Sequence, residues 1–131
     1  MTNKTIIIIA GILGVIAVAM GALGAHALKP LLSPESINSF NTASRYQIYH
    51  AILLIVLVGI QNHLSSKWFH FAWRAIMVGT ILFSGSIYLL STSSITGIGL
   101  KFILGPITPI GGIILITGWI SITIGALQKE N

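Results

Sequence analysis

The sequence predicts an all-α integral membrane protein with a single domain over residues 1–131. Hydrophobic residues make up 54% of the chain and charged residues only 7%, which leaves too little polar surface to cover a soluble protein of this length. The apolar residues also gather in runs close to the ~20 residues that a helix needs to cross a bilayer. We therefore expect four transmembrane helices, at about residues 5–27, 43–62, 74–91 and 107–127.

The first span, residues 5–27, is uncharged as far as His26 and long enough to cross ~30 Å of hydrocarbon. Lys4 and the small residues near the end of this run also resemble a secretory signal with a cleavage site. Cleavage would remove a face of small residues suited to close helix packing, so we expect the span to be retained. This face recurs at intervals of three and four: Ala10, Gly14, Ala17, Gly21 and Ala25.

The second helix is predicted to begin at Ser33-Pro34-Glu35. These residues supply a hydroxyl at the N-cap, a proline at the first helical position and an acid at the positive end of the helix dipole. Its fully apolar part, residues 51–60, is too short to cross a bilayer. A span of ~20 residues must therefore reach back to about residue 43. Residues 34–43 are predicted to form an amphipathic extension that leads into this span.

The third span, residues 74–91, follows a segment rich in basic and aromatic side chains, which is typical of a membrane interface. A loop is predicted after it, as far as about residue 106. Pro106 and Pro109 are expected to open the fourth span, because proline is tolerated at a helix start. Along that span a glycine recurs every seven residues, which predicts a packing face: Gly111, Gly118 and Gly125.

The basic residues are scattered over the junctions between spans instead of clustered, which argues against a nucleic-acid partner. With four spans, one side of the membrane receives Lys4, Lys67, Arg74 and Lys129, and the other receives Lys29, Arg45 and Lys101. By the positive-inside rule, four against three places both termini in the cytoplasm. The chain has no cysteine, so thiolate metal sites are excluded, and we expect no metal and no cofactor.

Depth along each helix predicts which polar side chains meet inside the membrane. A rise of ~1.5 Å per residue puts four of them in one buried layer: His50, Ser84, Tyr88 and Trp119. Nearer the outer surface a second group, through which a ligand would enter, consists of His26, Arg45, Tyr46 and Tyr49. Polar and ionisable residues are costly in hydrocarbon, so these two groups together form the predicted ligand-binding site.

Several roles remain open for these residues. The simplest is that His50 and Arg45 join helices or reach lipid headgroups, and Arg45 is also suited to grip a lipid phosphate. A proton relay through His50 and His26 lacks a carboxylate within any span, and haem ligation by the same pair would need two ligands offset by about 10 Å. Catalysis by Ser84 or Ser86 with His50 lacks an orienting acid. We therefore do not expect an enzyme.

Four stretches together carry a resemblance: GALGAHALK at 21–29, SRYQIYHAILL at 44–54, LFSGSIYLL at 82–90 and LGPITPIGGIILITGW at 104–119. The chain resembles the small, uncharacterised bacterial multi-pass membrane proteins related to animal transmembrane protein 256. This resemblance implies about four helices in the bacterial cell (plasma) membrane, and it brings no established reaction, ligand or cofactor. Its pattern falls on Gly24, His26, Tyr46, Gln47, His50, Ser84, Gly85, Tyr88, Pro109, Gly111, Gly112 and Trp119.

The function that we expect from these observations is that of a non-enzymatic integral membrane protein that binds membrane lipid or a membrane partner. The competing class is a small transporter or channel component that uses the polar layer around His50. Small-residue faces serve packing within one chain and between chains alike, so the sequence leaves a homo-oligomer open.

Overall fold

The computed structural model describes residues 2–99 and 101–129. In this part of the chain all regular structure is helical: α1 (Asn3–Ala25), α2 (Pro34–Ile60), the 3-10 helix η1 (Gln61–His63), α3 (Ser66–Ser91), α4 (Ser93–Thr96) and α5 (Lys101–Leu127). Four segments, namely α1, α2 with η1, α3 and α5, are long and apolar enough to cross a membrane. The prediction of an all-α protein with four spans is confirmed.

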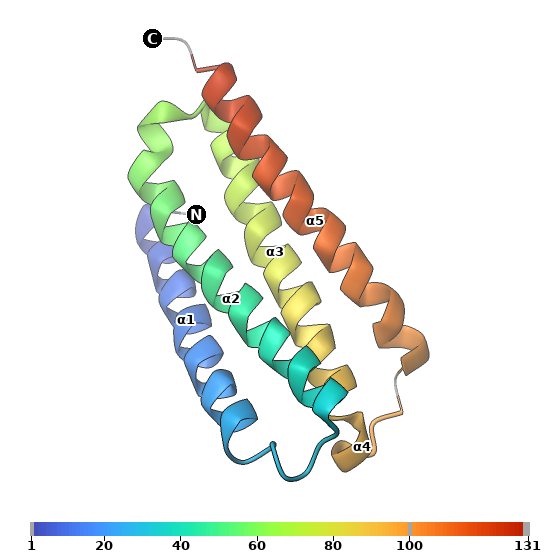
Figure 1. Ribbon diagram of the computed structural model, residues 1–131. Coiled ribbons are helices and arrows are strands. Elements are labelled where there is room, and N and C mark those ends of the chain that lie inside the picture. The colour runs from blue at the N-terminus through green and yellow to red at the C-terminus, as the bar shows by residue number, and fades with distance from the viewer. Residues whose placement is uncertain (1, 100, 130–131) are drawn as a thin grey trace.

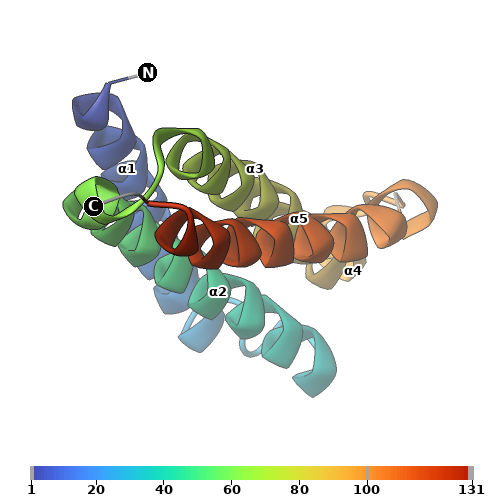
Figure 2. The same cartoon turned by 90° about the horizontal axis from the view of Figure 1, so that it is seen from above.

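The long helices form two antiparallel hairpins, α1 with α2 and α3 with α5, which join where α2 packs against α3 (Figure 1). One end of the bundle, here called the turn end, holds the start of α1, the turn between α2 and α3, and the end of α5. The opposite end, the loop end, holds α4 and the starts of α2 and α5. Seen from above, α2 and α5 run at an angle and diverge toward the loop end (Figure 2).

Helix α2 begins as the sequence predicts. The Ser33 side chain caps it by accepting a hydrogen bond from the Ser36 backbone N–H, and Pro34 occupies the first turn. The helix then continues without a break through residues 34–43 into the apolar part. Phe40 in this extension is buried, so the extension packs against the bundle through its apolar side.

The small-residue face of α1 lies against α2 over most of its length. Ala10 and Ala17 are buried, and a Cβ at Gly21 would lie 3.1 Å from Ser44 Oγ of α2. The prediction fails at the last turn, because Ala25 is exposed and Gly24 is buried in its place. A helix has ~3.6 residues per turn, so four turns after Ala10 the same face is reached after about 14 residues, at Gly24, and not after 15, at Ala25.

Two predicted boundaries are wrong. Helix α3 begins at Ser66 instead of residue 74, so the basic and aromatic segment is its first two turns. Helix α5 begins at Lys101 instead of residue 107, and both Pro106 and Pro109 lie inside it. Each proline removes one backbone hydrogen bond near the start of the helix, a loss that tight packing against a neighbouring helix can offset. The short helix α4, which is capped by Gly97 with φ 69°, lies in the predicted loop.

Helices α3 and α5 pack closely because glycines remove side chains from their interface. A Cβ at Gly79 of α3 would lie 2.9 Å from the Leu115 backbone nitrogen, and one at Gly111 of α5 would lie 2.5 Å from the Phe83 backbone nitrogen. Gly118 and Gly125 are also buried against α3. The predicted packing face of α5 is therefore confirmed.

The Gly111→Ala variant tests this interface. The added methyl group meets the main chain of Phe83, which cannot rotate away, so we expect the free energy of unfolding to fall by about 1–3 kcal/mol. Unfolding in detergent, or by steric trapping in bicelles, measures this change.

Gly112→Ala is the matched control for this variant. A Cβ there meets only the Phe83 ring, at 3.7 Å. Stability should stay unchanged or rise by up to about 1 kcal/mol through better helix propensity. Equal losses for the two variants would contradict the close α3 and α5 contact.

Candidate functional site

Helices α1 and α2 are joined by two buried polar side chains of α2. Ser44 Oγ donates a hydrogen bond to the Ala17 carbonyl at 2.8 Å, and Gln47 Nε2 donates to the Leu13 carbonyl at 2.8 Å. Both acceptors are backbone groups of α1. Hydrogen bonds of this kind satisfy polar groups that lipid cannot. Sequence analysis placed neither Ser44 nor Gln47 in the site, although Gln47 belongs to the family pattern.

Ser84 and Tyr88 join α3 to α2 on the same side of the bundle. Ser84, 1% exposed, donates to the Ala43 carbonyl at 2.9 Å. The Tyr88 ring packs on Phe40 with their centroids 4.9 Å apart. Its hydroxyl is buried near Ser44, but the pair does not meet the geometry of a hydrogen bond. Both predicted site residues therefore serve the packing of α1, α2 and α3.

His50 connects α2 to α5. Its Nδ1 lies 2.7 Å from the Tyr46 carbonyl, and the Trp119 indole N–H of α5 donates to His50 Nε2 at 3.3 Å. Only the neutral tautomer with the proton on Nδ1 satisfies both contacts. Both ring nitrogens are thereby engaged in hydrogen bonds, Nδ1 as a donor and Nε2 as an acceptor. The expected meeting of His50 with Trp119 is confirmed. Ser84 and Tyr88 do not join it, because they lie nearer the loop end, level with Ala43 and Phe40 of α2.

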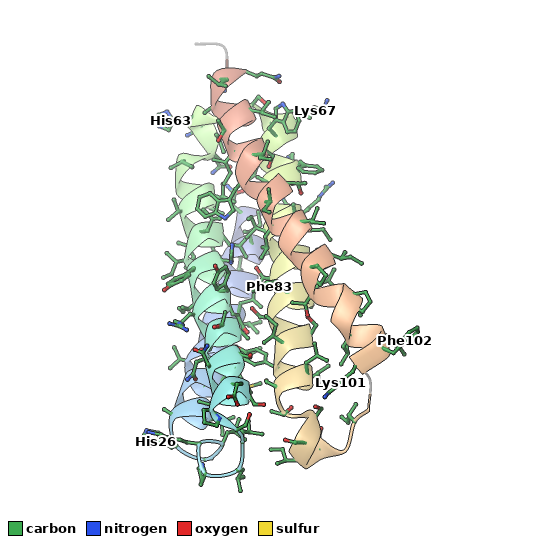
Figure 3. All side chains as sticks on the ribbon, turned by 45° about the vertical axis from the view of Figure 1, so that its right-hand side comes forward. His26, His63, Lys67, Phe83, Lys101 and Phe102 are labelled. Carbon is green, nitrogen blue, oxygen red and sulfur yellow. The ribbon has the colours of Figure 1, made fainter. Side chains whose placement is uncertain are left out.

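Aromatic rings surround this contact at the depth where α2 and α5 approach each other. The Tyr46 ring lies 5.2 Å from the ring of Phe83 and 6.1 Å from that of His50, measured between centroids. Trp119 meets His50 edge to face at 6.4 Å. Phe83 lies near the middle of the bundle in Figure 3. Tyr46, His50, Phe83 and Trp119 thus fill the angle between the diverging helices, and we call them the aromatic wedge.

The rest of the predicted outer group does not converge on His50. His26 follows the last residue of α1 and is exposed at the loop end (Figure 3). Arg45 is exposed, and its guanidinium donates to Thr42 Oγ1 at 3.3 Å, so the side chain reaches toward the loop end as a snorkelling arginine does. Tyr49 is 57% exposed beside Tyr46.

A cleft of about 510 Å³ opens between α2, α3 and α5 on the loop-end side of the wedge. Residues of all three helices line it: Glu35, Ser36, Ser39, Ile87, Leu90, Ser91, Gly105, Thr108 and Pro109. Its walls thus combine one carboxylate and four hydroxyls with aliphatic side chains. Sequence analysis missed this group because it depends on the angle between α2 and α5. The hydroxyls at positions 36 and 39, one turn of α2 apart, were the available signal.

A second hollow, of about 560 Å³, lies between α1 and α2 at membrane depth. Its lining is apolar, formed by alanine, glycine, valine and isoleucine residues of the two helices. Of these two hollows, the cleft between α2, α3 and α5 is the one that brings polar and apolar lining together.

Comparison with known proteins places the chain among bacterial membrane proteins. The model of the family described as "Protein of unknown function (DUF423)" matches residues 20–112. The UPF0382 inner membrane protein YgdD of Escherichia coli K12 is 32% identical over 131 residues, which is 100% of this chain and 95% of the relative. The UPF0382 membrane protein YwdK of Bacillus subtilis 168 is 36% identical over 132 residues, covering 95% of this chain and 98% of the relative. No solved structure matches the chain.

The contact between His50 and Trp119 predicts an energetic coupling across α2 and α5. In a double-mutant cycle of His50→Ala and Trp119→Phe, we expect the two losses of unfolding free energy to be non-additive by about 0.6 kcal/mol, the average for hydrogen bonds inside membranes. Reversible unfolding in bicelles measures the cycle. Trp68→Phe is the control partner, since Trp68 donates instead to Gln128 at the turn end. Coupling of His50 to Trp68 as large as that to Trp119 would contradict the assignment.

Proposed function

This chain belongs to the DUF423 family of membrane proteins, whose function is unknown, and we propose that it is a non-enzymatic lipid-binding protein. The proposed site is the cleft between α2, α3 and α5. The lipid chains would leave it sideways between α2 and α5, and the headgroup would stay at the loop end.

The observation that carries this proposal is the order of polar and apolar groups along the cleft. Glu35, Ser36 and Ser39 belong to the first two turns of α2, and Ser91 ends α3, so most of the polar lining lies at the loop end. Thr108 lies deeper, against Ser86. Toward the middle of the bundle the wedge offers Tyr46 and aromatic surface to hydrocarbon. A phospholipid has the same order, with a polar headgroup followed by apolar chains.

The state of His50 supports a structural role over the competing transport role. Its two ring nitrogens face a carbonyl of α2 and an indole N–H of α5, so the side chain joins the two helices by hydrogen bonds. We also propose that both termini face the cytoplasm, which the larger number of basic residues at the turn end supports. The cleft would then open to the outer leaflet.

Filling the cleft tests the proposal. In Ser39→Trp, an indole should occupy the space between α2 and α5, and we expect most of the lipid that stays bound to the purified protein to be lost. Native mass spectrometry of protein released from detergent measures bound lipid per chain.

Ile113→Trp is the control for this variant, since it places the same side chain on the exposed face of α5, where Ile113 is 61% exposed. It should retain as much lipid as the wild type. Equal retention by Ser39→Trp, or no retained lipid in the wild type, would reject the cleft as a lipid site.

A flux measurement separates the proposal from the transporter alternative. In vesicles reconstituted with the wild-type protein or with His50→Ala, we expect proton and ion flux at the level of empty vesicles. A pH-dependent flux in the wild type that disappears in His50→Ala would favour the transporter.

A further inference from the structure

We propose that the cleft selects a phospholipid whose headgroup carries a primary ammonium, the chemistry of an ethanolamine lipid; this inference rests on the proposed function. The argument depends on which hydrogen-bonding groups of the lining remain free. The Ser36 and Ser39 hydroxyls keep a proton to donate, whereas the other free groups of the lining offer only acceptors. The natural partner of these acceptors is a cation that has N–H donors.

Two hydroxyls of the lining, those of Ser91 and Thr108, already donate their protons to hydrogen bonds within the protein. Ser91 Oγ donates to the Ile87 carbonyl at 2.7 Å. Ser86 Oγ donates to the Phe83 carbonyl at 3.0 Å, so the proton in its 2.7 Å contact with Thr108 Oγ1 comes from Thr108. A hydroxyl that donates its one proton keeps only acceptor lone pairs. Ser91 and Thr108 therefore present acceptors to the cleft.

The unusual start of α5 adds a backbone acceptor. Pro109 has no N–H, so the carbonyl of Gly105, four residues earlier, has no partner at that position of the helix. Gly105 and Pro109 both line the cleft, which places this carbonyl on the cleft side of α5. Gly105 also carries no side chain to cover it, and a Cβ built there would meet nothing within 4 Å.

Glu35 is the one ionisable residue of the lining. At neutral pH an ionised carboxylate only accepts hydrogen bonds, and those from an ammonium are among the strongest in proteins. Glu35, Gly105 and Ser91 come from three different helices, so together they offer acceptors from three sides. A primary ammonium has three N–H donors to match them.

This inventory separates the common phospholipids by chemistry. A choline headgroup carries the same positive charge but has no N–H to donate. A glycerol headgroup has hydroxyl donors but no positive charge, and its lipid brings a net negative charge toward Glu35. An ethanolamine headgroup supplies both the charge and the donors.

A cation is also available for the lipid phosphate. Lys101 lies seven residues before Thr108, two turns along the same face of α5. In Figure 3 its side chain lies on the side of α5 toward α3 and α4, whereas Phe102 points away. The other cations of this end lie outside the cleft. Lys29 lines a separate hollow, formed by residues of the segment 29–41, and Arg45 donates a hydrogen bond to Thr42.

The experiment compares lipid retention in nanodiscs that contain equal amounts of ethanolamine, choline and glycerol phospholipids with matched acyl chains. Native mass spectrometry after ejection from the disc reports which lipid stays on the chain. For the wild type we expect the ethanolamine lipid to be enriched about tenfold to a hundredfold over the others, the value of one charge-assisted hydrogen bond. Glu35→Gln should remove this enrichment, and Glu35→Asp should keep part of it.

Lys29→Gln is the matched control, because it removes one charge at the same end but outside the cleft, and it should keep the enrichment. Enrichment that survives in Glu35→Gln, or a wild type that retains the three lipids equally, would overturn the selection while leaving the cleft a lipid site. A wild type that retains no lipid would instead reject the proposed function. Loss of lipid on adding free phosphoethanolamine would show that a soluble amine is the ligand, and would also overturn the proposal.

Discussion

The structure depends on one constraint, which is that polar groups at membrane depth must find partners inside the bundle. Four side chains of α2 and α3 meet it by bonding backbone carbonyls: Ser44, Gln47, His50 and Ser84. Three of these bonds cross from one helix to the next. They bind α1, α2 and α3 together within the segments that are long and apolar enough to cross a membrane.

The two hairpins use different means of packing, and the cleft results from this difference. Glycines bring α5 against α3, whereas in residues 2–99 and 101–129 the side-chain hydrogen bond that joins α5 to α2 is that of Trp119 with His50. Toward the loop end no comparable contact joins α2 to α5 among the described residues. The helices therefore separate there, and the space between them receives both hydroxyls and aliphatic side chains.

Much of the fold follows from the sequence because the length and hydropathy of a segment identify it as a membrane helix. Capping residues predicted the α2 start, the seven-residue glycine spacing predicted the packing face of α5, and residue counting predicted the contact of His50 with Trp119. Helix ends were harder to predict. Pro106 and Pro109 suggested that the last helix begins there, whereas α5 begins earlier, at Lys101. Ser84 and Tyr88 were placed at the wrong depth, because depth was counted from Arg74 although α3 begins at Ser66. They lie level with Ala43 and Phe40, seven and ten residues before His50 on α2. Depth comes from counting residues, so an error in where a helix begins shifts every depth along it.

The bonds from Ser44, Gln47 and Ser84 end on main-chain oxygens of Ala17, Leu13 and Ala43. Every amino acid carries such an oxygen, so these three acceptor positions are free to vary wherever size permits. Only the donors need to keep their chemical identity. A genetic screen of all single replacements should accordingly show asymmetric tolerance, with the polar donor positions of α2 and α3 intolerant and the acceptor positions of α1 and α2 limited by bulk alone.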